Sequence, residues 1–138
     1  KKVFYITNRK DSSSFLKFNK NNVKNSDYNI NQERVVEIKA LDEVIQFAKL
    51  VPPILLKIDV QGYELDVLKG CSNLLKKTTY IIVEVSENEI YQDQPVANEI
   101  IEYLNKQNYI IIKENLPTNI SKSNLFQKDI LFKNQLID

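Results

Sequence analysis

The sequence predicts one α/β domain with a mostly parallel sheet whose last strands are antiparallel. Two observations lead to this fold class. Strand-like apolar runs alternate with segments that repeat apolar residues at helical spacing, and the central run passes into a helix through a glycine. The chain has 138 residues, a length typical of a single domain. We expect residues 1–50 to form a lead-in and residues 51–138 a β-α-β-α-β-β core.

The lead-in is expected to hold two strands and one short helix. Residues 3–6 are β-branched and aromatic, and residues 33–40 alternate between apolar and polar, as strands do. Between them, residues 7–31 are rich in Asn, Ser and Lys and predict a surface loop, with a short strand fitting at 15–18. Residues 41–50 carry apolar side chains at helical spacing, and a proline pair stops that helix.

The core begins at residues 54–58, a compact apolar run typical of a strand buried on both faces of a parallel sheet. The later elements are a helix at 62–77, a strand at 80–85, a helix ending near Lys106, a strand at 109–112, a loop at 115–127 and a strand at 129–132. Asp93 is the expected N-cap of the second helix, with Pro95 in its first turn. Gly70 falls inside the first helix, where close packing on the sheet would explain it.

Composition argues against several classes of function. The formal net charge is +1, so there is no basic field to hold nucleic acid or an anionic membrane. The apolar runs are too short to span a bilayer. The single cysteine, Cys71, cannot form an internal disulfide and fits a reducing compartment. We therefore expect a cytoplasmic protein that binds neither nucleic acid nor membranes.

Three residue types are absent or scarce. The chain has no histidine, which excludes histidine-based metal sites and nucleophile systems within it. It has no methionine, and its two glycines, Gly62 and Gly70, lie close together. We therefore expect a piece of a longer protein, with any glycine-rich phosphate-binding loop outside this sequence.

Three carboxylates are expected at one edge of the sheet. In open α/β sheets, ligands bind beyond the carboxyl ends of the strands. Asp59 closes the strand at 54–58, Glu84 lies near the end of the next strand, and Glu64 begins the helix between them. Together they could act as a general base, bind an amine or hydroxyls, or hold a hard cation.

Each carboxylate also has a structural interpretation. Asp59 could cap the following helix, and Glu64 could neutralise its positive end. Glu84 lies in a buried-looking strand and needs a partner, for which Lys57 or another lysine would serve.

Three further residues and one run of serines carry weaker signals. By residue type, Gln61 is expected to face solvent, and Tyr91 either lines a site or packs within a loop. The serines at 12–14 suggest a flexible loop. Cys71 lies on an apolar helix stripe, so we expect a core residue rather than a nucleophile, since nothing nearby would lower its pKa.

Residues 57–70 (KIDVQGYELDVLKG) resemble the most recognisable block of FkbM-type S-adenosylmethionine-dependent methyltransferases. Other stretches resemble the family in the same order, at 12–15, 36–44, 81–85, 91–95 and 127–132. The resemblance covers roughly residues 3–133, and its central block is its specific part.

The resemblance implies the C-terminal portion of a Rossmann-like methyltransferase fold, without the N-terminal cofactor-binding strands. It implies methyl transfer from S-adenosylmethionine to a hydroxyl on a sugar or natural-product-like small molecule. Asp59, Glu84 and Glu64 would be catalytic, with Asp59 the first candidate for the base and Glu84 the second. Asp59 and Gln61 would contact the cofactor, Tyr91 would contact the acceptor, and no metal ligand is assigned.

The glycine-rich turn that holds the cofactor in this family has no counterpart here, so the isolated chain is expected to be inactive. An alternative is a non-catalytic binding or assembly module derived from the same fold, which an upstream Asp-x-Gly-x-x-x-Gly segment would argue against. Another α/β ligand-binding domain would explain the pattern but not the ordered motifs. Without the family's N-terminal strands, the strand at 55–58 would present an open edge, through which we expect homo-oligomers.

Overall fold

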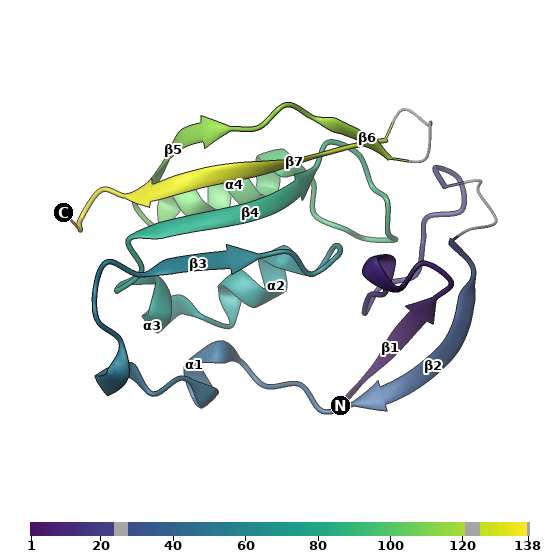
Figure 1. Cartoon of the computed structure of the whole chain (residues 1–138), viewed down its shortest axis with the longest axis horizontal. Helices are drawn as coiled ribbons and strands as arrows, with labels where there is room; N and C mark the ends of the chain where they lie inside the picture. The colour runs from purple at the N-terminus through teal and green to yellow at the C-terminus, as the bar shows by residue number, and fades with distance from the viewer. Residues whose placement is uncertain (24–27, 121–124, 138) are drawn as a thin grey trace.

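The computed structural model describes residues 1–23, 28–120 and 125–137. It shows a mixed α/β fold in which a small N-terminal sheet lies beside a larger one (Figure 1). Strands β3 and β4 of the larger sheet point toward the N-terminal sheet in this view, so their carboxyl ends face it. In the described part of the chain, no helix combines the length and the apolar content needed to cross a membrane.

The N-terminal sheet consists of β1 (Lys2–Thr7) and β2 (Ile30–Val36), which pair antiparallel. The second strand was expected at 33–40 but ends at Val36. No strand forms at 15–18, where the chain makes two isolated bridges instead, Ser14 with Tyr5 and Phe18 with Tyr91. These bridges tie the N-terminal loop to both halves of the molecule.

The larger sheet has the order β3 (Leu55–Ile58), β4 (Tyr80–Ser86), β7 (Leu125–Asn134) and β5 (Tyr109–Glu114). A short β6 (Thr118–Ile120), within a stretch expected to be loop, also pairs with β7. Strands β3 and β4 are parallel neighbours, as expected. The predicted antiparallel pairing of the last strands is confirmed by β5 with β7, but the prediction of mostly parallel pairing was wrong, because among the described strands only β3 and β4 pair in parallel. The closing strand inserts between β4 and β5 and runs antiparallel to both.

The helix predicted at 62–77 is two short helices, α2 (Glu64–Lys69) and α3 (Ser72–Leu75). The break falls at Gly70, whose nearest neighbours are Asp66 of its own helix and Ala40 of the lead-in, not the sheet as expected. A Cβ at Gly70 would lie 3.5 Å from the Cα of Ala40. The crossover from β3 to β4 therefore bends to accommodate the lead-in.

The other predicted helices are also shorter than expected. Residues 41–50 form α1 (Leu41–Val44) and a 3-10 turn, Phe47–Lys49. Helix α4 (Ala97–Lys106) has Val96 at its N-cap position, and the Val96 N–H donates to the Glu99 carboxylate. Asp93 is therefore not the cap: it lies in the preceding loop with φ 58°.

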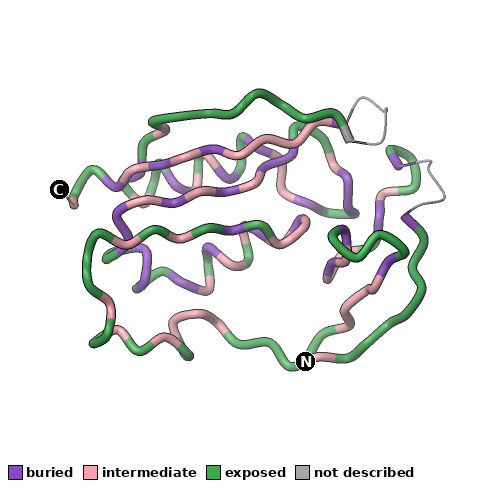
Figure 2. The backbone as a smooth tube through the Cα atoms, in the orientation of Figure 1, coloured by how far each residue is buried: buried purple, intermediate pink, exposed green. Residues whose placement is uncertain are grey.

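One face of the larger sheet forms the core with α2, α3 and α4. From Tyr80 to Val85 of β4 the residues alternate: Ile81, Val83 and Val85 are buried, and the residues between them are half-buried (Figure 2). Glu84 belongs to the half-buried set, so it points away from the helices. Cys71 is fully buried in the core, as predicted, and burial raises the pKa of its thiol to about 11.

Candidate active site

The turn after β3 has an unusual backbone. Gln61 and Gly62 both have positive φ, 54° and 94°, a conformation that side-chain-bearing residues seldom adopt. The buried carboxylate of Glu64 stabilises this turn: its Oε1 accepts hydrogen bonds from the N–H groups of Val60 (3.2 Å) and Gly62 (3.0 Å). Glu64 therefore holds the loop between β3 and α2 through hydrogen bonds. From the sequence, its structural role was expected to be only the neutralisation of the positive end of the helix.

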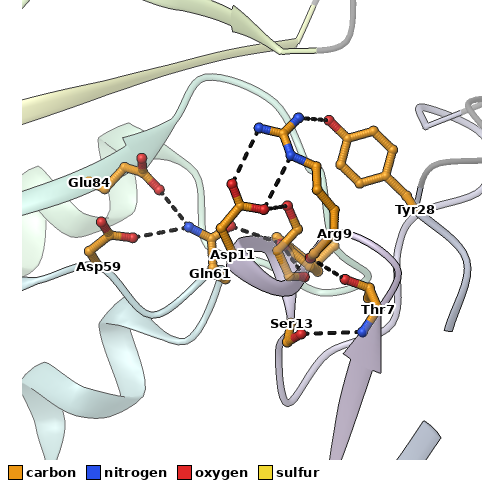
Figure 3. A network of polar contacts seen from close by, with 10 residues as sticks. Thr7, Arg9, Asp11, Ser13, Tyr28, Asp59, Gln61 and Glu84 are labelled. Atoms are coloured by element: carbon orange, nitrogen blue, oxygen red, sulfur yellow. Dashed lines mark hydrogen bonds and ion pairs between the residues drawn. The ribbon is translucent and has the colours of Figure 1, made fainter. Parts of the chain in front are cut away.

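The same turn brings the other two predicted carboxylates together. The side-chain amide of Gln61 donates to Asp59 Oδ1 (3.0 Å) and to Glu84 Oε2 (3.1 Å), bridging the ends of β3 and β4 (Figure 3). Gln61 thus points into the site, against the expectation that it faces solvent. Asp59 forms an ion pair with Lys57 (3.2 Å) and does not cap the helix.

Glu84 has amide partners rather than the lysine that was expected. Besides Gln61, its Oε2 accepts a hydrogen bond from the side-chain amide of Gln127 in β7, at 3.0 Å. Asp129 lies directly opposite Glu84 in the β4–β7 register. The sequence interpretation missed Gln127 and Asp129 as site residues, although their block was among the stretches that resemble the family. Only the pairing of β7 with β4 shows where they lie.

The N-terminal loop closes the other side of the turn. Ser14 is buried, and its hydroxyl donates to the Gln61 carbonyl oxygen at 2.6 Å. The serine run is thus a packed segment and not a free loop. Phe18 stacks on Tyr91, with ring centroids 4.7 Å apart, within a second apolar cluster that joins this loop to the segment after β4.

Tyr91 is almost completely buried behind Gln61. Its hydroxyl lies 2.9 Å from Gln61 Oε1 and 3.0 Å from the carbonyl oxygen of Ser12, so its single proton is donated to one of these acceptors. Burial raises the pKa of the Tyr91 hydroxyl, which keeps it protonated. The Tyr91 hydroxyl therefore contacts Gln61 directly, and a contact between Tyr91 and an acceptor stays a prediction.

These groups line a cavity of about 400 Å³ between the two sheets. Its walls come from the strand ends, the N-terminal loop and the segment before β7, and include Asp59, Gln61, Glu84, Tyr91, Gln127, Asp129, Arg9, Tyr28, Asn115 and Thr118. Arg9 pairs with Asp11 (3.2 Å) and donates to the Tyr28 hydroxyl (3.1 Å) at the far wall (Figure 3). Hydrogen-bonding groups dominate the lining, which suits a polar ligand.

Glu84 is the site carboxylate whose proton affinity is most altered. Burial, followed by the negative charges of Asp59, Glu64 and Asp129, raises the pKa of Glu84 to about 7. A carboxylate with this pKa can take up a proton near neutral pH, which is what a general base must do. Among the described residues, no three Asp, Glu or Cys side chains are arranged to hold a metal ion.

Comparison with known proteins gives two kinds of match. The family model of the methyltransferase FkbM domain matches residues 2–111. The chain is 35% identical over 63 residues to the hexuronic acid methyltransferase AglP of Haloferax volcanii, covering 44% of this chain and 26% of that protein. It is 38% identical over 69 residues to the 2-O-methyltransferase NoeI of Sinorhizobium fredii, covering 50% of this chain and 28% of that protein. The matches thus span about a quarter of these relatives' length, and no solved structure matches.

Proposed function

Because this chain belongs to the methyltransferase FkbM domain family, we propose that it is part of an S-adenosylmethionine-dependent O-methyltransferase that acts on a sugar hydroxyl. The names of the two relatives, a hexuronic acid methyltransferase and a 2-O-methyltransferase, support this acceptor class. We also propose that the described sheet is the C-terminal portion of the family's fold.

The observation that carries the proposal is the meeting of Asp59, Gln61 and Glu84 at the carboxyl ends of two adjacent parallel strands. Ligands of open α/β sheets bind at this edge. The three side chains also line a polar cavity, large enough for a sugar ring.

The polar side chains at the strand ends fit the proposed cofactor in part. S-adenosylmethionine, when bound, supplies a methyl group from a positively charged sulfur, which keeps the electron pair of the broken bond. The Asp59 carboxylate and the Gln61 amide would hold its polar groups, and carboxylates at this edge favour a cation. The sequence has no glycine outside positions 62 and 70, so a glycine-rich cofactor loop would have to come from elsewhere.

The acceptor oxygen that takes the methyl group must lose a proton. Glu84 is the residue best suited to accept it, because its pKa is about 7. At neutral pH, a large fraction of the Glu84 side chain is then ionised, and the ionised carboxylate still binds a proton readily. Asp59, which the sequence had suggested first, is paired with Lys57 and is better placed to orient a ligand. Hydrogen bonds from Gln61 and Gln127 fix the direction of the Glu84 carboxylate.

The test is a transfer assay with the natural protein that carries this sequence, radiolabelled S-adenosylmethionine and a panel of hexuronic acids and neutral sugars. Label should enter a sugar, and Glu84→Gln should reduce turnover by about 10²–10⁴-fold, the usual contribution of a general base. If label enters no member of the panel and S-adenosylhomocysteine does not bind either, the non-catalytic module is the better account.

A further inference from the structure

Gln127 reaches Glu84 because of the register of the closing strand. Glu84 faces Asp129, and the next pair on the same face is Ser86 with Gln127. Gln127 is therefore the diagonal neighbour of Glu84, within reach of a long side chain. Its amide donates to Glu84 Oε2 at 3.0 Å.

Gln61 donates to the same oxygen from the opposite side, at 3.1 Å. Within the described residues, both hydrogen bonds of the Glu84 carboxylate go to Oε2, which leaves Oε1 to take a proton from a ligand in the cavity. Two amides from two different elements, the turn after β3 and strand β7, thus fix one carboxylate at the end of β4.

The amide of Gln61 must itself be oriented for this. Its nitrogen faces Asp59 and Glu84, and its oxygen faces the Tyr91 hydroxyl at 2.9 Å. If the amide were reversed, its oxygen would face both carboxylates. The hydrogen bond from Ser14 to the Gln61 carbonyl holds the backbone of the turn in place beneath it.

We propose that Gln127 and Gln61 are positioning residues for the Glu84 carboxylate, and that buried Tyr91 fixes the orientation of the Gln61 amide that this requires. The proposal rests on the proposed function of Glu84 as proton acceptor. It gives Tyr91, which also lines the cavity, a role that acts through Gln61.

Amide N–H donors stabilise the ionised form of Glu84, so their loss should raise its pKa. The other groups that act on Glu84 are the carboxylates of Asp59, Glu64 and Asp129, which raise its pKa, and Lys57, which lowers it. A variant that replaces only the amide leaves these charges in place, so the shift it causes reports on the amide.

The test measures the pKa of Glu84 directly, by carbon NMR of ¹³C-glutamate-labelled natural protein, with Glu84→Gln used to assign the signal. Gln127→Leu removes one donor and should raise the pKa by about half a unit to one unit. Gln127→Met also removes the donor, keeps nearly the same shape, adds no charge, and should raise the pKa by a similar amount. Gln135→Leu, exposed just beyond the same strand, is the matched control and should leave it unchanged.

Tyr91→Phe should also raise the pKa of Glu84, by less than Gln127→Leu, whereas Tyr103→Phe on helix α4 should not. In the transfer assay, the acid limb of the kcat/KM profile of each variant should move to higher pH, by the amount that its Glu84 pKa rises in the NMR titration. A loss of packing alone would lower the rate without moving this limb.

Unchanged Glu84 titration in Gln127→Leu and Gln127→Met, both shown to be folded by circular dichroism, would overturn the proposal. If Gln127→Leu does not fold, the nearly isosteric and uncharged Gln127→Met decides the matter. Because NMR titration needs no turnover, this failure is distinct from failure of the proposed function, which would show as no label transfer and no S-adenosylhomocysteine binding in the unaltered protein.

Discussion

At the scale of single residues, the site depends on two consecutive positions with left-handed backbone, Gln61 and Gly62. Such conformations cost energy and persist only where surrounding contacts enforce them. Here those contacts are hydrogen bonds from Ser14 to the turn and from the turn to Glu64, and the packing of Tyr91. The backbone of the turn aims the Gln61 amide at both carboxylates.

Replacing Gly62 with alanine should destabilise the fold by about 1–3 kcal/mol. The new Cβ would lie 3.0 Å from Tyr91 Cδ2 and 3.2 Å from Leu16 Cδ1, at φ 94°. Urea unfolding provides the measurement. Gly70→Ala is the matched control, because its Cβ would meet only ordinary contacts at 3.4–3.5 Å, and it should stay within about 1 kcal/mol of the parent. Equal effects at the two glycines would contradict this account of the turn.

Replacing Asp59 with asparagine should lower turnover by about 10²-fold or more while leaving the melting temperature nearly unchanged. The side chain is partly exposed and its partners are Gln61 and Lys57, so little of the fold depends on its charge. Asp66→Asn, on the exposed face of α2, controls for the loss of one surface carboxylate. Full turnover in Asp59→Asn would remove Asp59 from the site.

The raised pKa of Glu84 predicts a pH dependence of stability. The folded protein holds this proton up to pH about 7, whereas the unfolded chain releases it near its ordinary pKa of about 4.3. Between these values the folded state binds more protons, so the free energy of unfolding falls as pH rises. We expect a fall of about 1–2 kcal/mol, allowing for solvent screening of a half-buried group. Glu84→Gln should abolish that part of the slope in urea titrations at pH 5 and 8, and an unchanged slope would contradict the assignment.

At the scale of elements, the join between β3 and α2 depends on one buried carboxylate. Glu64 accepts two backbone N–H groups of the turn through a single oxygen. Burial raises the pKa of Glu64, and hydrogen bonds from the backbone N–H groups of Glu64, Gly62 and Val60 oppose the rise. Helix α2 has no side-chain cap at Tyr63, so Glu64 provides the main polar contact at its start.

Two substitutions separate a structural from a catalytic role of Glu64. Glu64→Gln keeps an oxygen for both N–H groups and should change stability by less than about 1 kcal/mol, whereas Glu64→Ala leaves them unpaired and should cost about 2–3 kcal/mol. If Glu64 acts only on the turn, Glu64→Gln should retain most of the turnover. A drop of about 10²-fold in a stable Glu64→Gln protein would instead support the catalytic role that the resemblance implies.

The elements that the sequence predicted well are those with strong local patterns. The runs at 54–58 and 80–85 became parallel neighbours, and Asp59 and Glu84 were predicted to share an edge for that reason. The insertion of β7 between β4 and β5 had no local signal, so Gln127 was missed. Residue type alone predicted that Gln61 faces solvent, because its direction depends on a positive φ that residue type does not reveal. The family resemblance had already suggested Gln61 as a site residue.

At the scale of the whole molecule, the cavity exists because the N-terminal loop packs on the segment that follows β4. Phe18, Tyr28 and Tyr91 form the centre of this contact, and Leu125 extends it to the start of β7. Segments far apart in sequence thus form the walls, which explains why Arg9 and Tyr28 could not be assigned to the site from local motifs.

The open edge of β3 predicts self-association of the 138-residue chain. Among the described strands, β3 pairs with β4 alone, and Leu55 on β3 is 58% exposed. Unpaired strand edges with apolar side chains recruit further strands. Sedimentation velocity should show concentration-dependent dimers or larger species, reduced by Leu55→Lys. A strictly monomeric chain with one cooperative melting transition would contradict this prediction.

We propose that this chain contributes to an S-adenosylmethionine-dependent methyltransferase site. The most direct test is a calorimetric titration of S-adenosylhomocysteine into the natural protein that carries this sequence. We expect saturable one-to-one binding of S-adenosylhomocysteine, which Asp59→Asn should weaken. No heat of binding from a protein shown to be folded would contradict the claim and favour a non-catalytic module.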